Sequence, residues 1–295
     1  RRSSDLVEAG GLEAFGITER ELALMCASHS GTDEHVAVVR SIQQKIGVSE
    51  DRLLCGTHRP YHTPTYEAML RRGEAPSPNR HNCSGKHSGF LAYALLHDTP
   101  LEDYIAAEHP IQQAILQTFA DMSGVPEAQV HTGIDGCSAP VFAVPLYNAA
   151  LAFARLADPT EFSTSRARAC QRIVRAMLKH PDMVAGPERF DTEVMRLGAG
   201  RLVAKAGAEG YQSMALLPGA LGECSPALGI AIKIADGDLG KRAAPLVALE
   251  ILRQLGALSE GEIAQLPQFA PRPVLNWRKI EAGELRPVFK LVREA

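Results

Sequence analysis

The chain has 295 residues, of which 45% are hydrophobic and 22% charged, and its formal net charge is −3. These values are ordinary for a globular protein, and no block or stripe of Lys and Arg suggests a nucleic-acid partner. No apolar run is long enough to cross a bilayer. We therefore expect a globular protein that binds neither nucleic acid nor membrane.

Cysteine usage points to a reducing compartment. The six cysteines lie at positions 26, 55, 83, 137, 170 and 224, and no CxxC motif occurs. A chain of this length does not need a disulfide framework to fold. We expect a cytoplasmic protein in which most cysteines are buried as small apolar residues.

The first two thirds of the sequence predict mainly helix. Thr18 and Glu21 form a capping-box pattern that opens a helix over 19–27. Apolar residues at helical spacing predict further helices that end at Gly47, Gly124 and before Pro181. This region therefore favours a helical body.

The pattern changes near residue 200. Strands are predicted at 201–205, 211–217 and 229–234, followed by a helix over 241–255. This order predicts an α/β fold with a mainly antiparallel sheet flanked by helices, plus an additional helical portion. We expect one domain over 1–295, with a helix-rich part of about 1–200, a sheet-forming part of about 201–295 and no clear linker.

Four short segments combine Ser, His, Cys or Lys with glycine. They lie between the predicted helices and strands, at 26–31, 82–87, 133–138 and 205–210. Glycine allows the backbone to approach a ligand closely. A tight junction between elements is the simpler interpretation of any one segment, but four in one chain favour a shared site.

Lys205 ends the first predicted strand and is followed by small residues. Its Lys-Ala-Gly sequence differs at one position from the Lys-Thr-Gly of serine β-lactamases and penicillin-binding proteins, where the lysine supports a serine in acyl transfer. Ser28, after a predicted helix, is the candidate serine. A lysine desolvated beside hydroxyls has a lowered pKa and can take a proton from serine. The alternatives are an edge-strand lysine in water and a polar residue at a helix end.

Residues 82–87 precede an apolar helix predicted at 88–96. Backbone N–H groups at such a helix start favour an anion or oxyanion. Cys83 and Lys86 lie about one turn apart, and with Cys137 they make a candidate three-ligand metal set. Because lysine is an uncommon ligand, a buried thiol pair without metal is an equal alternative.

Three further polar side chains of these segments are candidates for binding substrate. Asp135 could orient a substrate amine or a lysine, although an Asp-Gly turn would also explain it. Ser30 and His87 lie within the same reactive segments. We expect the three to hold the amino-acid end of a substrate.

Taken together and in order, these segments resemble the bacterial L-asparaginase II family of the thermolabile, rhizobial type. This family is distinct from the larger bacterial asparaginases that use threonine nucleophiles. The matching text is LVE at 6–8, CASHSG at 26–31, NCSGKH at 82–87, GIDGC at 133–137, RFDT at 189–192 and KAGAEG at 205–210.

The resemblance implies a serine β-lactamase/glutaminase-like fold and catalysis by two Ser–Lys pairs. One pair corresponds to Ser28 and Lys205. The other is an Arg-Ser-x-x-Lys motif whose first half matches Arg2 and Ser3, but Leu6 stands where its lysine belongs. Family members carry more residues after this motif, so we predict a break in the chain between residues 3 and 6. The nucleophile is then either Ser3 or Ser28.

The resemblance also implies a zinc site at Cys83, Lys86 and Cys137. There the metal would modulate binding and would not generate the nucleophile. A homodimer and the small-molecule substrate L-asparagine are implied as well.

The expected reaction is hydrolysis of the side-chain amide of L-asparagine to L-aspartate and ammonia through an acyl-enzyme. We expect glutamine to react more slowly, because one extra methylene moves the carbonyl by more than about an ångström. Two alternatives remain open. One is a glutaminase or a β-lactam-handling hydrolase with the same Ser–Lys chemistry, and the other is a non-catalytic zinc or thiol sensor.

Overall fold

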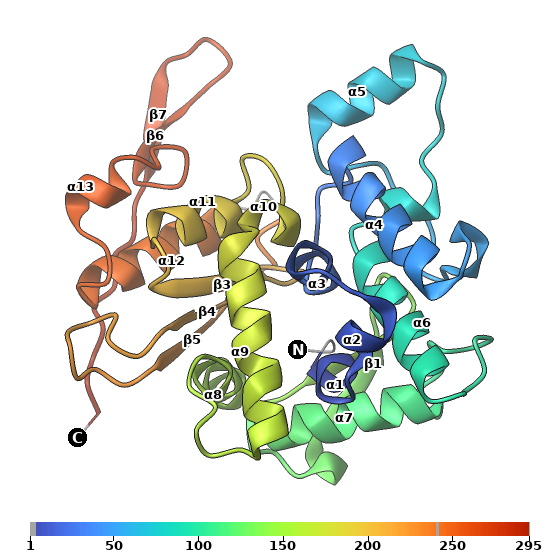
Figure 1. The fold of residues 1–295 in the computed structure, drawn as a ribbon. Helices are drawn as coiled ribbons and strands as arrows, with labels where there is room; N and C mark the ends of the chain where they lie inside the picture. Colours follow the sequence, from blue (N-terminus) through green and yellow to red (C-terminus); the bar gives the residue numbers. More distant parts are fainter. Residues whose placement is uncertain (1–3, 240–241, 295) are drawn as a thin grey trace.

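A computed structural model describes residues 4–239 and 242–294 (Figure 1). The helices are α1 (Ser4–Glu8), α2 (Gly11–Phe15), α3 (Glu19–Met25), α4 (Asp33–Ile46), α5 (Thr63–Arg71), α6 (Ser84–Leu96), α7 (Pro110–Ser123), α8 (Leu146–Ala157), α9 (Thr164–Lys179), α10 (Pro181–Val184), α11 (Phe190–Leu197), α12 (Ala243–Gln254) and α13 (Glu260–Ile263). The strands are β1 (His131–Ile134), β2 (Pro140–Ala143), β3 (Leu202–Ala206), β4 (Tyr211–Leu216), β5 (Leu228–Lys233), β6 (Arg272–Leu275) and β7 (Glu281–Leu285).

The central sheet is antiparallel, with strand order β3-β4-β5. Helix α8 packs on β4 and β5, while α12 packs on the same two strands and α11 lies against β3 (Figure 1). The approach of α8 is close, because a Cβ on Gly229 would lie 1.9 Å from the Ala150 carbonyl oxygen. The expected α/β class with an antiparallel sheet flanked by helices is confirmed.

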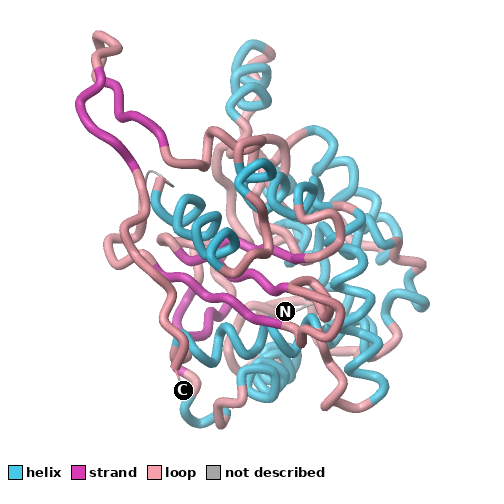
Figure 2. Tube along the Cα trace, turned by 90° about the vertical axis from the view of Figure 1, so that its left-hand side faces the viewer, coloured by secondary structure: helices cyan, strands magenta, loops and turns pink. Residues whose placement is uncertain are grey.

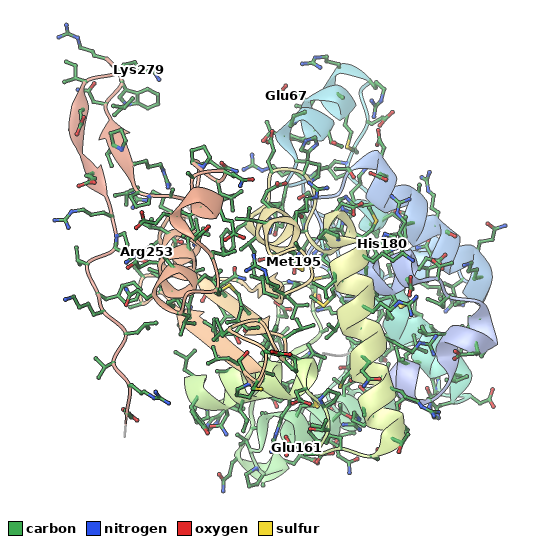
Figure 3. The ribbon with its side chains drawn as sticks, turned by 60° about the vertical axis from the view of Figure 1, so that its left-hand side comes forward. Glu67, Glu161, His180, Met195, Arg253 and Lys279 are labelled. Carbon is green, nitrogen blue, oxygen red and sulfur yellow. The ribbon has the colours of Figure 1, made fainter. Side chains whose placement is uncertain are left out.

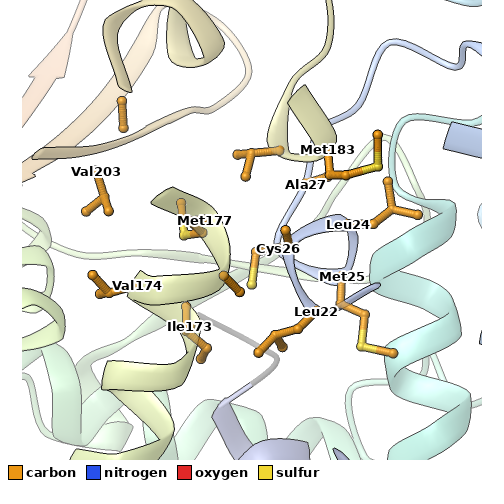
Figure 4. Packing of buried hydrophobic residues seen from close by; sticks show 14 of the residues in the cluster. Leu22, Leu24, Met25, Cys26, Ala27, Ile173, Val174, Met177, Met183 and Val203 are labelled. Atoms are coloured by element: carbon orange, nitrogen blue, oxygen red, sulfur yellow. The ribbon is translucent and has the colours of Figure 1, made fainter. Parts of the chain in front are cut away.

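Helix α3 runs through the middle of the core. It packs against α4, α6, α9 and α10. Leu22 of α3 and Cys26 just after it face Ile173 and Met177 of α9, and Val203 of the sheet lies on the far side of α9 (Figure 4). This packing brings the end of α3 close to the end of β3, although 177 positions separate Ser28 from Lys205.

The predicted strands are found within one residue of their expected ends. Thr18 caps α3 with the expected capping box, and its partner Glu21 is buried. Helix α6 begins at Ser84, four residues before the predicted start at 88, so the segment 82–87 lies partly inside the helix. The predicted helix over 241–255 is α12, and position 241 lies outside the described residues.

Two hairpins were not predicted. Hairpin β1–β2 lies inside the part that we expected to be mainly helical. Hairpin β6–β7 projects from the body as an arm (Figure 2), with Lys279 at its outer end (Figure 3) and Trp277 fully exposed. Within the described residues, no helix is both long and apolar enough to cross a membrane.

Candidate active site

Ser28 and Lys205 meet directly. The Lys205 Nζ donates a hydrogen bond of 2.7 Å to the Ser28 Oγ and a second one to the Ala206 carbonyl oxygen. Lys205 is only 2% exposed, whereas Ser28 is half-buried. The serine hydroxyl is therefore the part of the pair that a substrate can reach.

The backbone on both sides fixes the position of Ser28. Its N–H donates to the Val184 carbonyl oxygen at 3.0 Å, and the N–H of His29 donates to the Asn82 carbonyl oxygen at 3.1 Å. The ring of His29 accepts from the Gly31 N–H at Nδ1, so its Nε2 carries the proton and donates to Ser84 Oγ at 2.9 Å. Burial lowers the pKa of His29 well below its usual value, which keeps the ring neutral.

Lys205 is held by the sheet. It pairs in register with Ser213 of β4, and its side chain shares a face with Val203, two residues earlier. That face is turned towards α9, where Val203 lies near Val174 (Figure 4). The alternation of the strand therefore aims Lys205 at the end of α3, where Ser28 lies.

The motif at 189–192 fastens α11 to the end of β3. The Asp191 carboxylate accepts from the Ala206 N–H at 2.6 Å and from Gln212 Nε2 at 2.9 Å. Thr192 Oγ1 donates to the Pro181 carbonyl oxygen at 3.0 Å. These bonds fix the strand end that carries Lys205.

Ser30 points to the α11 side of the site. Its Oγ donates to the Ala185 carbonyl oxygen at 2.8 Å and accepts from Arg189 Nη1 at 3.4 Å. Gly186 packs against it, because a Cβ there would lie 2.8 Å from the Ser30 Oγ. Ser30 is thus well fixed beside the Ser28–Lys205 pair.

The residues of the candidate metal set also converge. Lys86 Nζ lies 3.0 Å from Cys137 Sγ and 3.4 Å from Asp135 Oδ2. Cys83 and Cys137 are free thiols, and each shifts the pKa of the other. Gly85 allows this arrangement, since it brings α6 so close to α3 that a Cβ would lie 2.4 Å from the Leu24 carbonyl oxygen.

The surroundings shift the pKa values of the two thiols in opposite directions. Hydrogen bonding from Cys83, then from His87, and the charge of Lys86 lower the pKa of Cys137 well below its usual range. The same Cys83–Cys137 bond, together with burial, raises the pKa of Cys83. Cys137 is therefore the more acidic of the two thiols and Cys83 the less acidic one.

Asp135 and His87 complete this cluster. One oxygen of Asp135 accepts from the Gly136 N–H at 2.8 Å, as expected for an Asp-Gly turn, while the other faces Lys86. His87 Nδ1 lies 2.6 Å from the Tyr104 hydroxyl. Burial raises the pKa of Tyr104, so its hydroxyl keeps its proton and donates to the ring. His87 is buried behind the thiols, while Asp135 is partly exposed.

Zinc fits this cluster only with the amine of Lys86 as a ligand. Two thiols and an amine are donors that zinc accepts. Among the side chains of residues 4–239 and 242–294, no group of three or more His, Cys, Asp and Glu could hold a metal ion. The site is therefore a Cys–Cys–Lys set or it is not a metal site.

The structure tests only part of the predicted chain break between residues 3 and 6. Ser3 lies outside the described residues. Ser4, Asp5 and Leu6 follow one another in helix α1, so no break occurs between residues 4 and 6. The peptide bond between Ser3 and Ser4 lies outside the described residues.

Sequence reasoning missed two residues of the site. Arg189 was noted only as part of a motif, and its guanidinium lies 5.7 Å from the centre of the Tyr61 ring. The Tyr61 ring also stacks on His58. No local pattern around Tyr61 could have revealed it, because the loop that carries it reaches the site only through tertiary packing.

Two surface hollows lie away from the site. One is lined by α8 and α9 residues that include Leu156 and Leu178, and the other by residues that include Arg196 and Gln265. Neither includes Ser28.

The family model for L-asparaginase II matches residues 2–287 of the chain. The chain therefore belongs to the L-asparaginase II family, a class of amidohydrolases. It is an enzyme, an asparaginase, in agreement with the resemblance of its motifs. A search of curated proteins finds no match.

Proposed function

We propose that the protein hydrolyses the side-chain amide of L-asparagine through an acyl-enzyme, with Ser28 as nucleophile and Lys205 as its proton acceptor. The observation that carries this proposal is the 2.7 Å hydrogen bond between the buried amine and the accessible hydroxyl. It lies within the reach required for proton transfer. Desolvation makes a buried lysine easier to deprotonate, and only the neutral amine can accept a proton.

The proposed reaction has two halves. Lys205 takes the Ser28 proton as the Oγ attacks the side-chain carbonyl carbon, and it returns that proton to the leaving nitrogen, so that ammonia departs. Water then attacks the ester, with Lys205 again accepting a proton, and aspartate leaves as Ser28 regains its hydrogen. One lysine thus serves as base and acid in turn.

Ser28 is preferred to Ser3 as the nucleophile. Ser28 has a lysine in contact, whereas the sequence places Leu6 where the lysine paired with Ser3 would stand.

Asp135, Ser30 and His87 are the proposed substrate-binding residues. Asp135 is partly exposed, and one of its carboxylate oxygens lies near Lys86. Its carboxylate can therefore bind the α-ammonium group of the substrate. Ser30 lies two residues from the nucleophile. Buried His87 acts indirectly, by supporting the Cys137 thiolate.

Zinc is proposed at Cys83, Lys86 and Cys137, where the convergence of two thiols and an amine supports it. Bound zinc would supply a fixed positive charge beside the substrate-binding groups. The Ser28–Lys205 chemistry does not depend on it. A homodimer and a cytoplasmic location are proposed from the family resemblance and the cysteine usage, and light scattering would test the dimer.

Ammonia release by the purified protein tests the function. L-asparagine should be hydrolysed, and L-glutamine about a hundredfold more slowly, because the longer side chain misplaces the carbonyl. Faster action on glutamine or on a chromogenic lactam would identify the alternative hydrolases. Stoichiometric zinc without any turnover would favour the zinc or thiol sensor. A chelator should leave part of the activity.

A further inference from the structure

Arg189 has no role in the mechanism above, although it faces the site. It precedes α11 directly, and its backbone N–H bonds to the Gly186 carbonyl oxygen at 3.4 Å. Gly186 has a φ of 118° and no room for a side chain beside Ser30. The tight turn at Gly186 therefore fixes the position of the Arg189 backbone and directs its side chain towards Ser30.

The guanidinium of Arg189 makes few contacts. It donates to Ser30 Oγ at 3.4 Å and lies over the ring of Tyr61, a cation–π arrangement. Within residues 4–239 and 242–294 no carboxylate forms an ion pair with it. Arg155 and Arg166, by contrast, each bind a glutamate. Arg189 therefore keeps most of its donors for another partner.

Tyr61 is influenced by charged groups besides Arg189. Burial raises the pKa of Tyr61, and its hydroxyl also responds to the charges of Cys83, Arg189 and Asp135. Arg189 thus lies against this tyrosine, and the Asp135 carboxylate is near enough to influence its pKa. An amino acid carries a carboxylate and an ammonium group on one carbon, and this pair of charges complements both.

We propose that Arg189 binds the α-carboxylate of the substrate, while Tyr61 holds the guanidinium in place. The proposal rests on the proposed function and deepens it. The planar guanidinium can bind a carboxylate with two parallel hydrogen bonds, a geometry that lysine cannot supply. With Asp135 at the α-ammonium group, Arg189 would fix the substrate so that its side-chain amide reaches Ser28.

Paired substrates separate this role from a structural one. β-Alaninamide is asparagine without the α-carboxylate and keeps the amine and the amide. For Arg189→Met, we expect kcat/KM for L-asparagine to fall about a hundredfold, the usual scale for a lost charged hydrogen bond, mainly through KM. On β-alaninamide the variant should equal the wild type.

Arg196→Met is the matched control, because Arg196 lies on the same helix α11, is exposed and forms its ion pair with the neighbouring Glu193. It should behave as wild type on both substrates. Arg189→Lys should recover only part of the loss, and both Arg189 variants should be checked for native thermal unfolding. Equal losses on both substrates would overturn the proposal, because they would show that Arg189 supports the fold or the serine.

Binding of product decides the question if turnover fails. β-Alanine is L-aspartate without its α-carboxylate. In calorimetry the wild type should bind L-aspartate far more tightly than β-alanine, and Arg189→Met should lose this preference. An unchanged preference would overturn the role of Arg189. A wild type that shows the preference yet releases no ammonia would refute the proposed function alone.

Discussion

Two lysines of this protein each contact a nucleophilic side chain at about the same distance, in contrasting surroundings. Lys205 lies on a buried strand, 2.7 Å from the Ser28 hydroxyl, and is only 2% exposed. Lys86 lies in the first turn of α6, 3.0 Å from the Cys137 sulfur and near the Asp135 carboxylate.

The surroundings decide what each lysine can do. Lys86 contacts both the Cys137 sulfur and the Asp135 carboxylate, so it is suited to hold a ligand. Lys205 faces a neutral hydroxyl in a buried position, which suits a group that must gain and lose a proton. The contrast predicts a proton relay at one lysine and a binding site at the other.

The largest effect should come from Lys205→Met. The substitution keeps the length of the side chain and removes the proton acceptor, so kcat should fall by roughly a thousandfold or more. Lys233→Met is the matched control, since Lys233 is exposed on β5. Steady-state ammonia release checks both. Near-native activity of Lys205→Met would refute the relay.

Ser28→Ala should cause a loss of similar size. Because serine and lysine act as one unit, the double variant with Lys205→Met should be hardly worse than either single variant. The comparison of the three variants in one ammonia assay measures this. Losses that multiply in the double variant would show that the two residues act independently.

At the second lysine we expect an effect on binding. Lys86→Met should weaken zinc binding by about a hundredfold and change kcat much less than Lys205→Met does. Cys83 has a raised pKa and must lose its proton to bind metal, so affinity should fall as the pH falls from about 8 to about 6. Competition with a chromogenic chelator measures it, and pH-independent affinity would contradict the assignment.

The smallest predicted effect concerns acid stability. Burial lowers the pKa of His35 below 6.5, and its Nδ1 accepts from the Thr32 N–H at 3.2 Å while Nε2 faces the Asp182 carbonyl oxygen. The folded state resists protonation, so stability is complete above the unfolded pKa of about 6.5 and declines as the pH falls below it.

His35→Gln should make this decline shallower, by at most about 1.4 kcal/mol per pH unit. Glutamine can still fill the N3 position of the capping box at Thr32. Urea unfolding at several pH values measures the slope, with His131→Gln, at an exposed position, as control. An unchanged slope would show that His35 does not control acid stability.

Much of the sheet and the meeting of Ser28 with Lys205 were predictable, because strand alternation and short motifs are local features. Lys205 lies on a buried strand, and its neighbours resemble a known catalytic sequence. Hairpin β1–β2 was missed because His131–Ile134 is exposed throughout and lacks the alternation that marks a strand.

Arg189 and Tyr61 could not be assigned from sequence for a different reason. Their meeting depends on a turn at Gly186 and on a loop that folds back over the site, and both are products of packing. Local patterns describe which elements form, whereas the walls of a site depend on how those elements lie against one another.

The central claim is that Ser28 is the nucleophile. Rapid acid quenching of the enzyme during turnover of L-asparagine, followed by peptide mapping in a mass spectrometer, tests it most directly. The account predicts a β-aspartyl ester on Ser28, absent from Ser28→Ala. An ester on Ser3, Ser30 or any other residue would contradict it.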